Sequence, residues 1–148
     1  MGNKDVYFVA VKVFLEDDAG RFLIVKDRFG DWDIPGGRLK ENEFSVALEA
    51  VIERKVKEEL GDIHYELGEP TVFMRHERDE ILPDGKKEKR RIFAIGYMAK
   101  YIGGQIKLGK NHEKFGWVGI DTFKPEDYFS GGWLAGIKEF QFKCKKSV

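Results

Sequence analysis

Residues 36–61 constrain the fold of this chain more than any other stretch. They begin with a glycine pair, Gly36 and Gly37, followed by a polar turn, and continue as one long amphipathic segment that ends in a cluster of charges. Two glycines let the backbone approach a ligand closely, and a helix that follows them holds carboxylates at a fixed spacing. The stretch therefore predicts a cation site beside a turn that can bind phosphate.

A helix is expected over residues 44–60, with Gly61 ending it. At about 100° per residue, an apolar face that includes Phe44 and Val51 becomes charged in the last turns of this helix. The charges on or near that face are Arg54, Lys55, Glu58 and Glu59. Charges near a helix end can also form a solvated tip, in which ion pairs at i,i+3 and i,i+4 spacing contribute only about 0.2–0.5 kcal/mol each.

The motif around this helix resembles the Nudix box of the MutT-like hydrolases, which reads G, five residues, E, seven residues, then R-E-U-x-E-E-x-G-U, where U is aliphatic. The matching positions are Gly37, Glu43, Arg54, Val56, Glu58, Glu59 and Gly61. Just upstream, Trp32, Pro35 and Gly36 fit the W-x-x-P-G-G lead-in of that family. The resemblance implies a Nudix-type α/β/α sandwich with a mixed β-sheet, which residues 1–148 form as a single domain.

The sequence departs from the family pattern in three places. Ten residues, rather than seven, separate Glu43 from Arg54, and the three extra residues make nearly one helical turn, which the motif can absorb. The residue after the last glycine of the box is Asp62, and the aliphatic residue follows one position later as Ile63. Lys55 stands where the family has the first glutamate of its R-E pair, so a cation replaces a carboxylate.

The resemblance implies an enzyme that hydrolyses a nucleoside diphosphate linked to another moiety, with Mg²⁺ or Mn²⁺ as its cofactor. By the same resemblance, the carbonyl of Gly37 and the carboxylates of Glu58 and Glu59 would be metal ligands, and magnesium does prefer oxygen donors. The residues expected to bind the substrate are Trp32, Gly36, Arg38 and Glu43. The leaving group is left open, because several nucleotide classes share the diphosphate.

Two further residues receive catalytic roles from the resemblance. Arg54 would hold a glutamate in position through a charge-assisted hydrogen bond. Glu113 lies in a predicted loop shortly before a strand at Trp117, where the family often has a glutamate that reaches the metal site from the opposite side. Glu113 would therefore be a further ligand or the general base. His112, its neighbour, is a weaker candidate, since a lone loop histidine is more often exposed or bonded locally.

Lys55 supports a rival interpretation from a different class of protein. Its ammonium could lie between Glu58 and Glu59 as an internal counter-ion, which would leave a catalytically weakened nucleotide-binding domain. Alternatively, Lys55 could take part in catalysis by contacting a substrate phosphate, or it could extend outward into solvent. The sequence leaves these alternatives open.

The rest of the chain alternates strands with a second helix. Residues 6–15 and 21–26 are expected to form a hairpin around the turn at residues 16–20, and the other expected strands are residues 63–67, 71–76, 92–101, 105–108 and one at Trp117. From Gly132 onward, Trp133, Ile137, Phe140 and Cys144 recur at helical spacing, which predicts an amphipathic terminal helix. This order of elements favours a mixed sheet between two helices.

A run of basic residues precedes the strand at residues 92–101, after a turn signature at residues 83–85. Such a run is usually the solvated tip of a hairpin. The alternative is that a cation of this run reaches substrate phosphates, and Arg90 and Arg91 are the candidates because they lead into the strand.

Composition excludes several classes of protein. Lys plus Arg and Asp plus Glu both number 26, so no net charge steers the chain toward nucleic acid or an acidic membrane surface. The longest apolar run near the N-terminus is interrupted by Lys12 and is too short to span a bilayer. With a single cysteine, Cys144, an intramolecular disulfide is excluded. We therefore expect a cytoplasmic enzyme that acts on a small-molecule nucleotide and has no nucleic-acid or membrane partner. The oligomeric state is left open, with a homodimer as one alternative.

Overall fold

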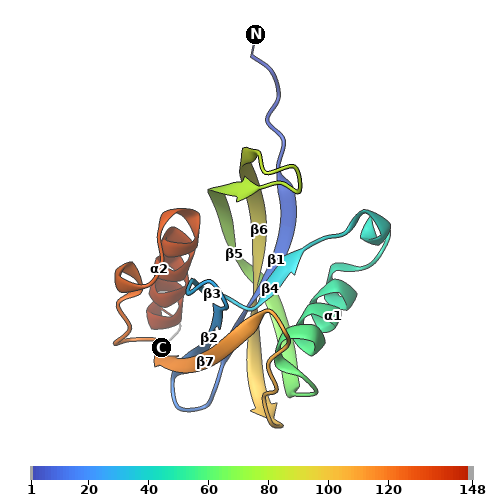
Figure 1. Cartoon of the computed structure of the whole chain (residues 1–148). Coiled ribbons are helices and arrows are strands. Elements are labelled where there is room, and N and C mark those ends of the chain that lie inside the picture. The colour runs from blue at the N-terminus through green and yellow to red at the C-terminus, as the bar shows by residue number, and fades with distance from the viewer. Residues whose placement is uncertain (1, 147–148) are drawn as a thin grey trace.

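The computed structural model describes residues 2–146, which form one curled sheet with a helix on each side (Figure 1). The strands are β1 (Phe8–Glu16), β2 (Arg21–Asp27), β3 (Trp32–Asp33), β4 (Gly36–Arg38), β5 (His64–Ile81), β6 (Lys87–Gly103) and β7 (His112–Gly119). The helices are α1 (Leu48–Leu60) and α2 (Gly131–Lys146), with short 3-10 turns η1 (Glu41–Glu43) and η2 (Pro125–Asp127). No helix in the described part of the chain is long and apolar enough to cross a bilayer.

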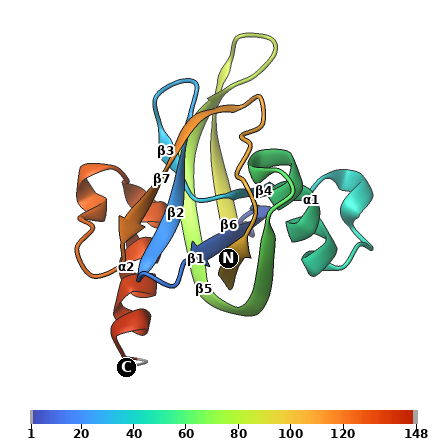
Figure 2. The ribbon, with the colours of Figure 1, turned by 90° about the horizontal axis from the view of Figure 1, so that it is seen from below.

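The sheet is mixed, as the sequence predicts. Its strand order is β3-β2-β1-β6-β5, with β4 paired to β1 and β7 paired to β2. Strands β1 and β6 run parallel over nine residue pairs, from Phe8 opposite Ile92 to Glu16 opposite Lys100, and the other pairings are antiparallel. The view from below shows α1 and α2 on opposite sides of this sheet (Figure 2). The predicted α/β/α sandwich is therefore confirmed.

Alternation along β1 builds a separate core under each helix. Ala10 and Phe14 lie on the side of α2, and Val11 and Val13 lie on the side of α1, because successive side chains of a strand point to opposite faces. The predicted stripe of α2 packs in the first of these clusters, through Trp133, Ile137, Phe140 and Cys144. Lys12 occupies the position between Ala10 and Phe14, so a buried cation interrupts the row that faces α2.

Strands β1 and β2 diverge after the turn that joins them, which makes room for the predicted glycine pair and its neighbours. The turn after β1 forms as predicted, with the side chain of Asp17 accepting hydrogen bonds from the backbone of Ala19 and Arg21. The two strands nevertheless pair only at Glu16 and Phe22, so the expected hairpin opens at once. β4 pairs with the other end of β1, and β3 pairs with β2. The segment containing both short strands therefore fills the gap between β1 and β2.

The predicted helix begins later than expected. Residues 44–47 form a turn rather than the first helical turn, and Phe44 is 94% exposed instead of lying on the apolar face. Helix α1 starts at Leu48 and ends at Leu60, and it is capped by Gly61, whose φ of +82° is a conformation that favours glycine. The three extra residues of the motif are thus accommodated before the helix, and they leave its charged end unchanged.

Three strand boundaries also differ from the prediction. The two expected strands at residues 63–67 and 71–76 are one long strand, β5, whose register with β6 shifts on both sides of Pro70. Residues 105–108 form no strand. The predicted loop carrying His112 and Glu113 is already the beginning of β7.

Cys144 is expected to react slowly with alkylating reagents. Burial raises the pKa of its thiol to about 12, and the nearby carboxylate of Glu16 acts in the same direction. Because the thiolate is the nucleophile, iodoacetamide should modify the folded chain at pH 8 at least tenfold more slowly than a cysteine peptide. Unfolding in urea should restore the ordinary rate, and a folded chain that reacts as fast as the peptide would contradict this burial.

Candidate active site

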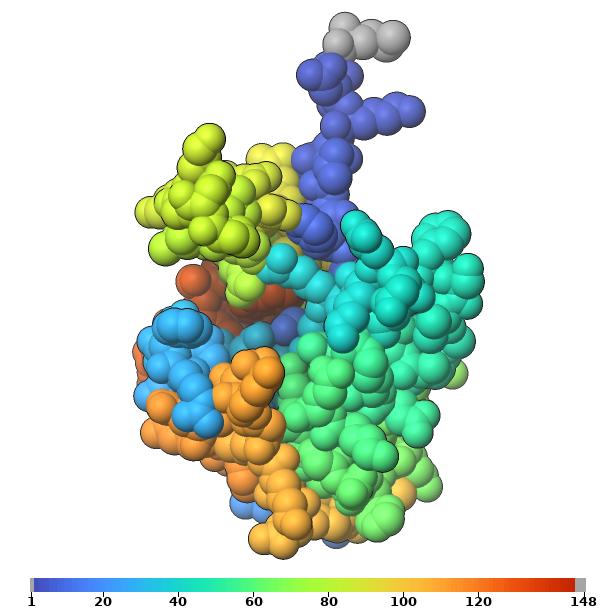
Figure 3. Space-filling view, turned by 45° about the vertical axis from the view of Figure 1, so that its right-hand side comes forward, coloured from blue at the N-terminus to red at the C-terminus, as the bar shows by residue number. Residues whose placement is uncertain are grey.

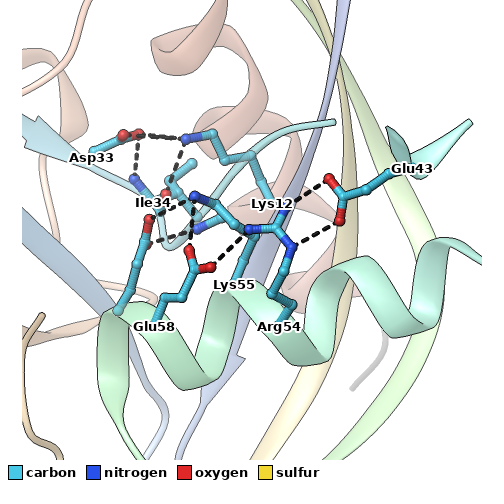
Figure 4. A network of polar contacts seen from close by, with 9 residues as sticks. Lys12, Asp33, Ile34, Glu43, Arg54, Lys55 and Glu58 are labelled. Atoms are coloured by element: carbon cyan, nitrogen blue, oxygen red, sulfur yellow. Dashed lines mark hydrogen bonds and ion pairs between the residues drawn. The ribbon is translucent and has the colours of Figure 1, made fainter. Parts of the chain in front are cut away.

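Arg54 clamps the charged end of α1. Its guanidinium binds both carboxylate oxygens of Glu43, each at 2.7 Å, and it donates a third hydrogen bond to Glu58 at 2.9 Å (Figure 4). These bonds lower the pKa of both glutamates and keep them ionised. Glu43 also accepts a hydrogen bond from the backbone of Lys40 at 2.8 Å. Arg54 therefore holds Glu58 of the motif in position. Its bonds to Glu43 also connect α1 to the residue that lies before the three inserted residues.

Lys55 points into the expected metal site. Its ammonium lies 3.5 Å from Glu58 and 3.9 Å from Glu59, and its side chain is only 19% exposed. It also passes directly over Gly37, where any added side chain would collide with Cε and Nζ of the lysine. The ammonium group therefore lies within ion-pair distance of Glu58 and Glu59, the two predicted carboxylate ligands, and its side chain passes over Gly37. The alternative in which Lys55 extends away into solvent is not the arrangement found.

Glu59 is the more enclosed of the two predicted metal-binding carboxylates, with a side chain 14% exposed against 46% for Glu58. One of its oxygens accepts a hydrogen bond from the backbone N–H of Gly36 at 3.0 Å. Burial raises the pKa of Glu59 to about 7, although the positive charge of Lys12 and the bond from Gly36 act in the opposite direction. A carboxylate that is costly to ionise where it lies would be stabilised by a cation.

Lys12 and Asp33 were not predicted as site residues. The ammonium of Lys12 binds the carboxylate of Asp33 at 3.0 Å and the backbone carbonyl of Ile34 at 3.2 Å, and it lies 5.0 Å from the ring of Trp133. It is 4% exposed. The sequence did contain a signal for this ion pair, because Lys12 lies within the apolar run of residues 6–15 and a buried lysine needs a partner.

A cleft opens beside these groups, formed by two neighbouring hollows of about 180 and 240 Å³ that share Asp33, Arg78 and Trp133. The first hollow is also lined by Gly36, Gly37 and Arg38, and the second by Trp32, His76 and Tyr128. In the space-filling view the cleft lies between the β5–β6 hairpin, the loop after β2 and α1, with α2 at its floor (Figure 3). An elongated substrate therefore has room on the side of the glycine pair away from α1.

The predicted substrate residues lie in different places. Trp32 lines the cleft, and the ammonium groups of Lys26 and Lys114 lie 5.9 and 5.5 Å from the centre of its ring. Arg38 lines it too and forms an ion pair with Glu80. Glu43 is instead bound by Arg54 and is buried away from the cleft.

Glu113 and its neighbour His112 lie at the start of β7. Glu113 is half-exposed and forms a long ion pair of 3.8 Å with Lys26 across the strands. His112 faces inward, with Nδ1 buried and without a hydrogen-bond partner among the described residues, and burial lowers the pKa of its imidazole. The side chain that faces inward is therefore that of His112, one position before Glu113, the residue that the sequence analysis favoured.

The donors suit a divalent cation only in part. Glu58 and Glu59 offer oxygen, which magnesium prefers, and the burial of Glu59 favours a cation beside it. Within residues 2–146, however, no three Asp, Glu, His or Cys side chains gather closely enough to hold one ion together. The third place is taken by Lys55, whose ammonium must move before a metal can bind Glu58 and Glu59.

Solved structures with a similar fold include several Nudix proteins. A MutT protein from Methanosarcina mazei Go1 is 19% identical and has a TM-score of 0.71, with 97% of this chain and 99% of that chain covered. An ADP-ribose pyrophosphatase from Streptococcus suis 89-1591 is 14% identical with a TM-score of 0.67, covering 95% and 93%. A MutT NUDIX hydrolase from Burkholderia pseudomallei is 22% identical with a TM-score of 0.60, covering 91% and 98%. At these identities the likeness establishes the fold.

The sequence itself establishes the family. A comparison with curated proteins found no match. The family model described as NUDIX domain matches residues 6–135, which include both sides of the cleft, the glycine pair and the whole of α1. The chain therefore belongs to the Nudix family.

Proposed function

We propose that this Nudix protein is a pyrophosphohydrolase that cleaves a nucleoside diphosphate linked to another moiety, in a reaction dependent on Mg²⁺ or Mn²⁺. The observation that carries the proposal is the largely enclosed carboxylate of Glu59, which accepts a hydrogen bond from the backbone of Gly36, a residue that lines the cleft. Hydrolysis of a phosphoanhydride needs positive charge on the phosphoryl oxygens and a positioned water. A divalent ion on Glu58 and Glu59 would supply that charge.

The residues of the chain would orient the reactants. Arg54 keeps Glu58 ionised and fixed, because a charge-assisted hydrogen bond restricts the carboxylate. The glycine pair lets the diphosphate approach the backbone, and Lys12 adds a fixed positive charge beside it. We propose Glu113, near the start of β7, as the general base.

A panel of nucleotide substrates tests the activity directly. ADP-ribose, a nucleotide sugar, a dinucleoside polyphosphate and a nucleoside triphosphate should be incubated with Mg²⁺, with Mn²⁺ and with EDTA. The proposal requires turnover of at least one substrate that EDTA abolishes. The absence of metal-dependent turnover throughout the panel would favour the catalytically weakened binding domain, which the position of Lys55 between Glu58 and Glu59 supports.

Glu59→Gln and Glu113→Gln are each expected to lower kcat at least tenfold, about 1.4 kcal/mol of activation free energy. Glu59→Gln removes a charged metal ligand, so a higher concentration of Mn²⁺ should restore part of the lost kcat.

Glu113→Gln removes a group that acts mainly in the transition state, so the KM for substrate should change little. Glu126→Gln, on η2 outside the cleft, is the control. An unchanged kcat in Glu113→Gln would assign Glu113 to the surface and leave His112 as the candidate base.

A further inference from the structure

The β5–β6 hairpin extends beyond α2 and carries an unusual order of charges. The register places Arg78 directly opposite Arg90, and Glu80 directly opposite Glu88. Alternation puts all four on the same side as Met74, which belongs to the core under α2. Like charges that face each other across two strands destabilise the pair. The stability of the hairpin alone therefore does not account for this arrangement.

Glu80 is shared by three arginines from three strands. Arg38 of β4 binds both of its carboxylate oxygens, Arg78 of β5 binds it at 3.0 Å, and Arg90 of β6 lies 3.8 Å away. The side chains of Arg38 and Arg90 also lie over the ring of Phe8, at 5.3 and 4.7 Å. The three guanidinium groups are thereby held close together, on a carboxylate that is 21% exposed.

The cluster holds more positive charge and more donors than its own residues satisfy. Its second carboxylate, Glu88, binds Arg90 at 3.2 Å and no other cation among residues 2–146, so three guanidinium groups face two carboxylates. Nε of Arg90 is buried without a hydrogen-bond partner among the described residues. Burial, with the neighbouring charges of Arg78 and Arg90, lowers the pKa of Arg38. An added anion would relieve the repulsion and accept the spare hydrogen bonds.

The cluster also lies where a substrate would pass. Arg38 and Arg78 line the same hollow as Gly36 and Gly37, so an anion bound by the arginines would lie at the end of that hollow. In the space-filling view the hairpin tip overhangs this side of the cleft (Figure 3). Arg91, the other arginine singled out from the sequence, lies on the opposite face of the hairpin and binds Glu77 and Asp5.

We propose that Arg38, Arg78 and Arg90 form a second anion subsite, which binds a phosphate group of the substrate outside the phosphoanhydride bond that is cleaved. The phosphate takes the place of Glu80 on the arginines. The inference rests on the proposed function and narrows its substrate class to nucleoside diphosphate derivatives that carry a further phosphate. Planar guanidinium groups suit this ligand, because they bind phosphate oxygens in pairs.

Binding of inorganic tripolyphosphate to the full chain, measured by calorimetry in EDTA, tests the subsite without any turnover. Arg78→Gln and Arg90→Gln should each weaken binding about tenfold, the usual effect of losing a hydrogen bond to a charged group. Arg91→Gln is the matched control, with the same charge change one residue away, and should bind like the wild type. Glu80→Gln should tighten binding several-fold, because the competing carboxylate is neutralised.

The Glu80→Gln variant decides between a binding site and a structural cluster. If the arginines only fasten the hairpin to β4, this variant lowers the unfolding temperature and binds tripolyphosphate no more tightly, which would overturn the subsite. Equal weakening by Arg91→Gln would overturn it as well, since binding would then follow net charge. Because metal and hydrolysis play no part, a failed substrate panel with these binding results would reject the hydrolase and retain the subsite.

Discussion

Replacing Lys55 by glutamate is expected to tighten the binding of Mn²⁺ roughly a hundredfold. The ammonium lies 3.5 Å from Glu58 and 3.9 Å from Glu59, so it competes with a divalent ion for both carboxylates. A unit charge about 4 Å from another is worth about 4 kcal/mol at an effective dielectric near 20, and solvent screening reduces this value. Calorimetric titration with Mn²⁺ measures the change, and turnover should rise with metal affinity.

Lys57→Glu provides the matched control for this experiment. Lys57 lies on the same helix, is 74% exposed and forms a long ion pair of 3.8 Å with Asp62, so the same charge change should leave Mn²⁺ affinity nearly unaltered. If Lys55→Glu leaves the metal affinity unchanged but raises KM, Lys55 contacts a substrate phosphate and belongs to the catalytic machinery. If neither constant changes, the competition inferred from the distances is wrong.

Gly36→Ala is expected to lower the free energy of unfolding by roughly 3 kcal/mol or more and to remove activity. Gly36 has a φ of +143°, and a methyl group there would collide with the backbone carbonyl of Val11 and lie 2.8 Å from Cα of Lys12. Neither strand can move without disturbing the pairing of β1 with β4. Urea unfolding followed by circular dichroism measures the loss.

Gly37→Ala separates this backbone collision from a general intolerance of the turn. The atoms nearest to a methyl group at Gly37 all belong to the flexible end of Lys55, so the unfolding free energy should change by less than about 1 kcal/mol. The lysine must then turn aside, and Mn²⁺ affinity should increase. Equal destabilisation by both substitutions would show that the collision with β1 is not what requires glycine at position 36.

The sequence predicts the elements whose contacts are local. The face of α1 that carries Lys55 and Glu59 follows from helical periodicity, and the same periodicity places Trp133 in the core under α2. The resemblance to the Nudix box supplies the family, which the match over residues 6–135 confirms. The predicted start of α1 is four residues too early, because Phe44 is apolar and yet lies exposed in the turn before the helix.

Contacts between distant strands could not be predicted. The expected hairpin pairs only at Glu16 and Phe22, because β4 pairs with residues 10–12 of β1 where β2 would otherwise continue, and turn signals carry no information about that partner. Lys12 meets Asp33 only because β4 returns alongside β1. The three arginines around Glu80 come from β4, β5 and β6, so their convergence depends on the whole sheet.

The bond between Arg54 and Glu43 has a consequence for how this motif can vary. It joins the two ends of the segment that holds the three extra residues, and Phe44 at the base of that segment is almost fully exposed. Length changes within this loop are therefore absorbed between two fixed anchors and need not reach Glu58 and Glu59. In this chain the number of residues between Glu43 and Arg54 can therefore change without moving the carboxylates, whereas the spacing along α1 is set by the pitch of the helix.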